Sequence, residues 1–222
     1  MFKDDAQEAT PILQRALRNI LGAVPANGLG GSDLRTACGL LYADAEQLLY
    51  YDQAGPPLSS CFELARKNGA TQSQIEWVRQ QTGLEAPVTV GATMVANSIM
   101  WLCLVTEGRI VADMTFTSRQ DVDALKLVVN DVFADAEEVA ADDMDQMSYR
   151  GLVELHANII AFLVQTARPL PVMLTFAFAQ SMPTLTMSNR LYYDASRADE
   201  LRAENKVVHP LFMLPTGQAL SS

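Results

Sequence analysis

The chain has 222 residues, of which 49% are hydrophobic, so it can bury a sizeable core in one large domain or in one domain with a small appendage. Its formal net charge is −10 and its pI is near 4.6, which argues against a surface that mainly neutralises phosphates. We therefore do not expect direct nucleic-acid binding.

The three cysteines, Cys38, Cys61 and Cys103, form no CxxC pair and have no histidine at ligand spacing. Neither a zinc site nor a disulfide framework is indicated, and we expect buried thiols. The N-terminal stretch "MFKDDAQEATPILQRAL" lacks the apolar run and the small-residue cleavage site of a secretory signal. Synthesis in a reducing cytoplasm is the expectation that follows.

Apolar residues recur at helical spacing from the start of the chain. Residues 7–22 carry one apolar stripe, with Thr10 predicted as the N-cap before Pro11. The glycine-rich stretch 23–31 predicts a loop or hinge, and Ser32 is the predicted N-cap of the next helix.

That second helix is predicted over 33–51. Gly55 and two prolines are expected to end it, ahead of a short helix over 59–69. Thr71 and Gln74 have the T-x-x-Q spacing of a capping box, which predicts the start of another helix.

The most apolar stretch runs over 86–105 and is long enough to raise the question of a membrane span. Thr89, Thr93 and Asn97 interrupt it, so a core helix packed by its neighbours is the better interpretation. We expect no membrane span.

The second half of the chain is predicted to be helical as well. Residues 109–118 have the β-branched and aromatic content of a short extended segment. Ser118 with Asp121 predicts the cap of a long helix over 119–146, and a further helix is predicted over 149–166.

The predicted fold class is mainly α, because strands and helices do not alternate along the chain. We expect a multi-helix domain over 1–186, with a sub-boundary near 86–115 as an alternative. A small helix-turn-extended appendage is expected over 187–222, and the stretch 172–180 before it is either helical or extended.

Few residues of the chain are arranged in a pattern typical of catalysis or ligand binding. His156 and His209 are the only histidines, and His156 is expected to be a satisfied helix histidine. The acidic cluster over 135–145 offers ligands for a hard cation but lacks the glycine turn of a calcium loop, so a solvated face or a surface for a basic partner is preferred. The glycines of 27–33 fit neither phosphate-binding pattern. We predict no catalytic, cofactor-binding or metal-binding residues and no cofactor; an enzyme that uses the acidic cluster with a cation is a further hypothesis.

The last residues of the chain, from about 196, differ in pattern from the helices before them. Ser196 and Asp199 predict a cap for a two-turn helix whose Leu201 faces inward, and Asn205 is placed to end it in a left-handed turn. After it, "PTGQAL" predicts a turn that feeds a short edge strand, with Gly217 expected at positive φ.

This tail is similar to a known module. The pattern D-E-L-x-x-x-N, an apolar pair, Pro, and then P-x-G-x-x-L resembles the second half of a LysM module. The residues that carry it are Asp199, Glu200, Leu201, Asn205, Pro210, Pro215, Gly217 and Leu220. The first half of the module is not evident in the sequence.

A longer resemblance runs from about Thr115 to the end. It is to the C-terminal part of the phage Mu type DNA circularisation protein family, in which "RLY-D-x-x-R-A-D-E-L", an Asn and "HP" close the chain. The matching residues are Arg190, Leu191, Tyr192, Asp194, Arg197, Ala198, Asp199, Glu200, Leu201, Asn205, His209 and Pro210.

The resemblance implies a structural component of the baseplate hub of a contractile phage tail, near the tail tube and the tape-measure protein. Its members are generally longer, with an N-terminal domain that has no counterpart here. Location in the virion tail, assembly with other tail subunits and homo-oligomerisation follow as expectations. The expected docking residues are Leu191, Tyr192, Leu201, Asn205, His209, Pro210, Leu211, Phe212, Leu214, Pro215, Gly217 and Leu220. The alternative is a degenerate LysM-like peptidoglycan-binding module on a helical scaffold.

Overall fold

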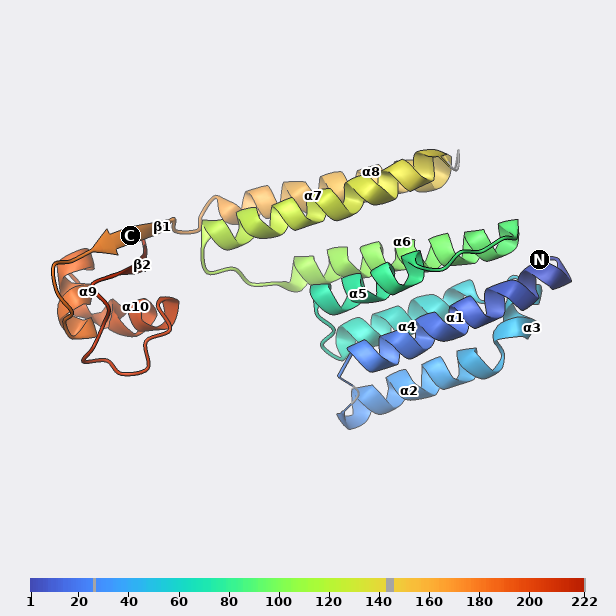
Figure 1. Ribbon diagram of the computed structural model, residues 1–222, viewed down its shortest axis with the longest axis horizontal. Coiled ribbons are helices and arrows are strands. Elements are labelled where there is room, and N and C mark those ends of the chain that lie inside the picture. The colour runs from blue at the N-terminus through green and yellow to red at the C-terminus, as the bar shows by residue number, and fades with distance from the viewer. Residues whose placement is uncertain (26, 143–145, 222) are drawn as a thin grey trace. The chain divides into compact units, whose positions relative to one another are not determined.

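The computed structural model describes residues 1–25, 27–142 and 146–221. These residues form ten α-helices, one short 3-10 helix and one two-stranded antiparallel sheet (Figure 1). The predicted fold class, mainly α with a small C-terminal appendage, is confirmed.

The chain divides into two compact units, which are described separately. The N-terminal unit consists of Met1–Met114 and Val132–Ile159. The C-terminal unit consists of Thr115–Asp131 and Ile160–Ser222.

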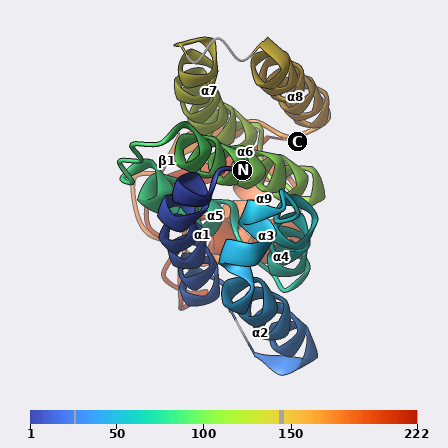
Figure 2. The same cartoon turned by 90° about the vertical axis from the view of Figure 1, so that its right-hand side faces the viewer.

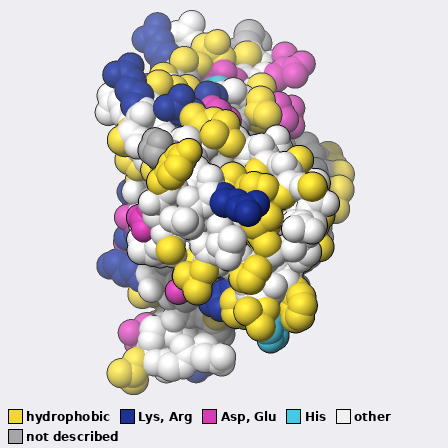
Figure 3. All heavy atoms as spheres, turned by 90° about the vertical axis from the view of Figure 1, so that its left-hand side faces the viewer, with side chains coloured by type: hydrophobic (Ala, Val, Ile, Leu, Met, Phe, Trp, Pro, Cys, Tyr) yellow, Lys and Arg dark blue, Asp and Glu magenta, His cyan; other side chains and the backbone are white. Residues whose placement is uncertain are grey.

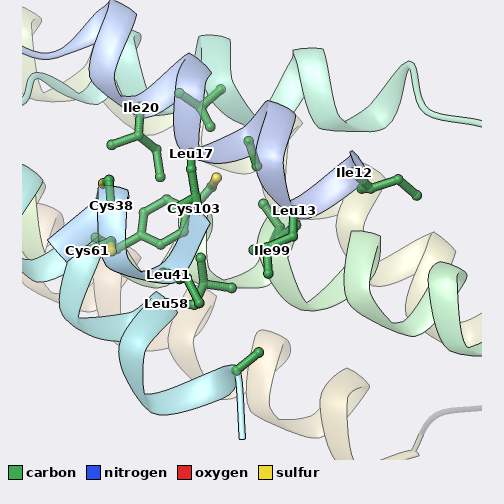
Figure 4. Close-up of a cluster of buried hydrophobic side chains, with 14 of the residues drawn as sticks. Ile12, Leu13, Leu17, Ile20, Cys38, Leu41, Leu58, Cys61, Ile99 and Cys103 are labelled. Atoms are coloured by element: carbon green, nitrogen blue, oxygen red, sulfur yellow. The ribbon is translucent and has the colours of Figure 1, made fainter. Parts of the chain in front are cut away.

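Six helices make up the first part of the N-terminal unit. They are α1 (Lys3–Ala23), α2 (Gly28–Ala43), α3 (Ala45–Tyr50), α4 (Gly55–Lys67), α5 (Gln72–Gly83) and α6 (Val90–Asp113). α1 packs against α2, α3, α5 and α6, and α2 packs against α4; Figure 2 views several of these helices nearly end-on. Their apolar stripes share one core, in which Leu13, Leu17 and Ile99 are fully buried (Figure 4).

The start of α1 differs from the sequence prediction. Pro11 lies inside the helix, and Thr10 is not its N-cap but donates a hydrogen bond from Oγ1 to the carbonyl of Ala6 at 2.6 Å. An interior proline costs roughly 3 kcal/mol because it removes one helical hydrogen bond. Burial of Ala6 and Ala9, which continue the apolar stripe upstream, offsets part of that cost.

The boundaries of the next helices also differ. α2 begins at Gly28 rather than after Ser32, and Gly31 is buried in its first turns. The second helix predicted over 33–51 is interrupted at Asp44, which separates α2 from α3. Pro56 and its neighbour open α4, since a proline in the first turn needs no hydrogen-bond partner.

Two predicted caps are confirmed. Thr71 accepts a hydrogen bond from the backbone of Gln74, whose side chain accepts one from the backbone of Thr71, so α5 begins with a capping box. Ser118 and Asp121 exchange the same kind of bonds, at 3.1 and 3.2 Å, and precede α7 (Arg119–Asp142).

α6 is long and apolar enough to cross a membrane, and 56% of its most apolar window is buried within the protein. Ala92, Ile99 and Cys103 of this helix belong to the core that α1 lines. Packing of this kind is typical of a core helix, and the absence of a membrane span stays a prediction.

The extended segment predicted over 109–118 is not a strand. α6 continues to Asp113, because Ile110 and Val111 carry on its buried stripe, and the residues after it are irregular. The helix predicted over 149–166 is confirmed as α8 (Gln146–Ala167).

The C-terminal unit contains the sheet. Its elements after α8 are β1 (Met173–Ala177), α9 (Thr184–Tyr192), the 3-10 helix η1 (Ala195–Arg197), α10 (Ala198–Glu204) and β2 (Thr216–Leu220). β1 pairs antiparallel with β2, so the stretch 172–180 is extended over Met173–Ala177 and is not helical. The boundary expected at residue 186 falls inside this unit, because β1 lies before it and its partner strand after it.

Candidate functional site

Long-range pairing closes the C-terminal part of the chain into a folded piece. Phe176 of β1 stands opposite Gly217 of β2, and Met173 stands opposite Leu220. An isolated bridge joins Met182 to a residue of the tail, Met213. Helices α9 and α10 lie between the two strands in sequence, and α10 packs on β2.

A small core fills the space between these elements. Met187 of α9, Leu201 of α10 and Met213 are fully buried, and Phe176 and Ala219 of the two strands pack with them. The prediction that Leu201 faces inward is confirmed. This core contains side chains from before and after residue 186, so the appendage predicted over 187–222 shares its core with β1.

The twelve predicted docking residues separate into two groups. Seven of them are buried or half-buried within the C-terminal unit: Leu191, Tyr192, Leu201, Asn205, Pro215, Gly217 and Leu220. The other five are exposed and follow one another along a single loop: His209, Pro210, Leu211, Phe212 and Leu214.

Asn205 holds α10 to β2 rather than ending the helix in a left-handed turn. Its Nδ2 donates to the carbonyls of Leu201 and Gln218, and its Oδ1 accepts from the backbone N–H of Gln218 at 2.8 Å. The left-handed residue is the next one, Lys206, with φ 51. The side chain of Asn205 therefore satisfies the backbone of the edge strand.

Gly217 is needed for space and not for positive φ, which the structure does not give it. A Cβ at this position would meet the side-chain oxygen of Asn205 and lie 2.7 Å from Cζ of Phe176. Only glycine leaves room for both neighbours.

The cap predicted from Ser196 and Asp199 is also corrected. Asp194 accepts a hydrogen bond from the backbone of Ser196 at 2.8 Å, and bonding with Ser196 lowers the pKa of the Asp194 carboxyl. Arg197 pairs with Glu200 at 2.6 Å. The chain begins its turn two residues before the predicted cap because the Asp side chain reaches forward to an unpaired N–H.

The exposed residues form what we call the apolar loop, residues 208–214. The exposed fraction is 94% for Val208, 56% for Leu211, 69% for Phe212 and 60% for Leu214. Figure 3 views the molecule from the left-hand side of Figure 1 and shows hydrophobic side chains gathered beside a histidine near the lower edge. Leaving so many large apolar side chains in water is typical of a contact surface.

Hydrogen bonds hold the backbone of the apolar loop at both ends. The carbonyl of Pro210 accepts from the backbone N–H and the hydroxyl of Thr184, at 2.7 and 2.8 Å. The carbonyl of Met213 accepts from the hydroxyl of Ser181 at 2.7 Å. The loop is therefore pre-organised although its side chains are exposed.

Sequence reasoning also missed exposed apolar residues from β1 to η1. Leu174, Leu185 and Tyr193 have exposed fractions of 54%, 62% and 92%. Leu185 follows Thr184, which binds the apolar loop. Tyr193 follows the end of α9 and has a left-handed backbone conformation, with φ 57, which is uncommon for an aromatic residue.

A buried carboxyl in the N-terminal unit was also missed. Glu107 of α6 is 4% exposed; its Oε2 accepts a hydrogen bond from Gln72 at 2.9 Å, and its Oε1 has no partner among the described residues. The pKa of Glu107 is raised to about 8, mainly by burial and also by the nearby Glu76 carboxylate, while the hydrogen bond from Gln72 and the charge of Arg79 oppose the shift. The signal in the sequence was an acidic residue just after the most apolar stretch, 86–105.

His156 and the acidic cluster over 135–145 form no metal-binding arrangement among the described residues. Nδ1 of His156 lies 2.9 Å from Glu137, and its ring stacks on Phe133, so the prediction of a satisfied helix histidine is confirmed. Among the described residues no three potential ligands gather to hold a metal ion. Two acids of the predicted cluster, Asp143 and Asp145, lie outside the described residues.

All three thiols are buried, as predicted. Cys38 of α2 lies beside Cys61 of α4 in the core of the N-terminal unit (Figure 4). Burial raises the pKa of the Cys103 thiol well above its ordinary value, so it is held as the neutral, weakly nucleophilic form.

The C-terminal unit thus offers a contact surface on a closed strand–helix–helix–strand frame. The chain was also compared with known proteins: no family model matches it, and no curated protein matches it.

Proposed function

We propose that the chain is a structural subunit of a contractile phage tail, at the baseplate or hub, and that it docks on neighbouring subunits through the apolar loop. The observation that carries the docking role is this loop, whose backbone is hydrogen-bonded at both ends while Val208, Leu211, Phe212 and Leu214 are exposed. Apolar anchors on a pre-organised segment bind without a large ordering cost.

The kind of assembly comes from the resemblance of the tail to the phage Mu type DNA circularisation protein family. The net charge of −10 supports docking on a subunit with a basic surface, since complementary charge speeds and orients association. In this proposal the partners are the hub, tail-tube and tape-measure proteins, together with further copies of the chain.

The test is size-exclusion chromatography with light scattering on the purified chain, alone and with the hub and tail-tube proteins of the same source. We expect a discrete ring or a stable co-complex. The double variant Leu211→Ser/Phe212→Ser should weaken the complex by roughly a hundredfold, because two apolar anchors are lost.

The matched control is Leu29→Ser/Leu84→Ser, which changes two exposed leucines of the N-terminal unit. It should assemble as the parent chain does. A monomer that ignores these partners, or a loop variant that assembles like the control, would contradict the proposal.

A second candidate, a LysM-like module that binds peptidoglycan, is supported by a separate observation. The sequence matched only the second half of such a module, and the C-terminal unit contains a strand and a helix, β1 and α9, ahead of that half. Retention of the chain on purified peptidoglycan at low salt would favour this function. Absence of retention would exclude it.

A further inference from the structure

A large apolar pocket lies in the N-terminal unit, far along the chain from the apolar loop. Its volume is about 900 Å³, within the range of small-molecule sites. The start of α1, the α3–α4 corner and the first turns of α6 surround it. Its apolar lining includes Leu13, Leu49, Leu58, Met94 and Val95.

The charged groups among the described lining residues are the carboxylates of Asp5 and Asp52 and the N-terminal ammonium of Met1, which donates to the carbonyl of Tyr50 at 3.2 Å, so the net charge of the lining is negative. Asp5 is half-buried at the start of α1, and Asp52 is exposed after α3. An apolar cavity with acids at its edge disfavours fatty acids and other anions, because bringing a second negative charge close costs energy in a partly desolvated site.

The N-terminus of α6 does not reverse this preference. A helix N-terminus attracts anions, but here carboxylates already compensate it. Glu8 accepts hydrogen bonds from the backbone N–H groups of Val88 and Thr89 at 2.7 and 2.9 Å. Asp5 lies directly against the first turn, so that a Cβ on Gly91 would be 2.7 Å from its Oδ2.

Asp52 is held in an unusual backbone conformation, with φ 59. Its N–H donates to the carbonyl of Leu49 at 3.1 Å, which ends α3 and turns the chain at the edge of the pocket. Asparagine adopts the left-handed conformation at least as readily as aspartate. The charge of residue 52 can therefore be removed without strain on the turn.

We propose that this pocket binds a cationic amphiphile, a small molecule whose alkyl or aromatic body lies against the exposed lining residues Phe2, Val90 and Met94 and whose ammonium group lies near Asp5 and Asp52. The cavity supplies burial for the body, and the two carboxylates supply the preference for positive charge. This site is independent of the apolar loop and of the proposed tail assembly.

The test is isothermal titration calorimetry with three probes of equal chain length, used below their micelle concentrations: octyltrimethylammonium, octanoate and octanol. We expect saturable 1:1 binding of the cation, about tenfold tighter than that of octanoate. Asp52→Asn should weaken cation binding by about threefold and leave octanol binding unchanged, because an exposed charge pair contributes less than about 1 kcal/mol.

The matched control is Asp33→Asn, which removes an exposed carboxylate of α2 that does not line the pocket. It should bind all three probes as the parent chain does. Val95→Phe, which fills part of the cavity, should weaken binding of the cation and of octanol alike. Equal affinity for cation and anion, no effect of Asp52→Asn, or no saturable binding at millimolar concentration would overturn the proposal.

Discussion

At the residue scale, Glu107 is the group whose chemistry departs most from its ordinary behaviour. It is buried in the N-terminal unit, and the charged groups that act on it are Glu76 and Arg79. Because Glu76 and Arg79 pair with each other at 2.6 Å, the Arg79 guanidinium does not belong to Glu107 alone. At neutral pH the carboxyl of Glu107 is therefore mainly protonated.

A consequence for stability follows from the raised pKa. Between the ordinary pKa of 4.5 and the folded value of about 8, the folded protein keeps a proton that the unfolded chain has released. The contribution of this proton to the free energy of unfolding is complete below pH 4.5 and is lost as the pH rises through 8. The free energy of unfolding should fall by up to about 1.4 kcal/mol per pH unit in this window from this one group.

The measurement is urea unfolding of the parent chain and Glu107→Gln at pH 5, 6, 7 and 8. The difference between their free energies of unfolding should change with pH in favour of the glutamine variant. Glu154→Gln removes an exposed carboxyl of α8 and controls for the loss of one acid. A constant difference across the four pH values would contradict the prediction.

At the scale of elements, the junction between α10 and β2 determines whether the C-terminal unit closes. The side chain of Asn205 forms hydrogen bonds with both the backbone N–H and the carbonyl of Gln218. Gly217, which has no side chain, leaves the space that Asn205 and Phe176 occupy beside β2. Both contacts join residues that are distant along the chain or separated by a loop.

We expect Gly217→Ala to destabilise the C-terminal unit by roughly 1–3 kcal/mol, because the new Cβ would displace a ring and a hydrogen-bonded amide. Gly39→Ala is the control, since Gly39 lies exposed in α2 with open space around it. That control should be neutral or stabilising by up to about 1 kcal/mol. Thermal unfolding followed by circular dichroism distinguishes the two, and equal melting temperatures would contradict the prediction.

At the scale of the whole molecule, the core of α1 to α6 and the core around Met187 are separate clusters, so changes in the second should leave the first folded. The core of the N-terminal unit is drawn from α1 to α6, whereas the core around Met187 and Leu201 is drawn from β1 to β2. Truncation after Asn189 removes α10 and β2 but leaves β1 and Met182 without their partners.

Such a truncated chain should keep the unfolding transition of the N-terminal unit. It should also bind a hydrophobic dye and be cleaved by protease within residues 172–189, because the paired backbone and the core side chains there become exposed. Truncation after Ala167 removes both β1 and β2. This shorter chain should keep the unfolding transition of the N-terminal unit and should lack the cleavage within residues 172–189. Loss of cooperative unfolding in the chain ending at Asn189 would show that the units are not separate.

The local parts of this fold could be predicted from the sequence. The helices, the mainly α class, the capping box of Thr71 and Gln74, and the cap of Ser118 and Asp121 depend on residues three or four positions apart, so they are visible in the order of residues. The exposed part of the candidate site, from His209 to Leu214, was also among the predicted residues.

What the tertiary structure alone decided depends on partners far away in the chain. β1 is a strand because β2 pairs with it, Gly217 is required because Asn205 and Phe176 approach it, and Glu107 has a raised pKa because the packed helices exclude water. For the same reason the sequence could not separate the docking residues that face inward from those that face solvent. Burial is a property of the packed chain, and local spacing does not contain it.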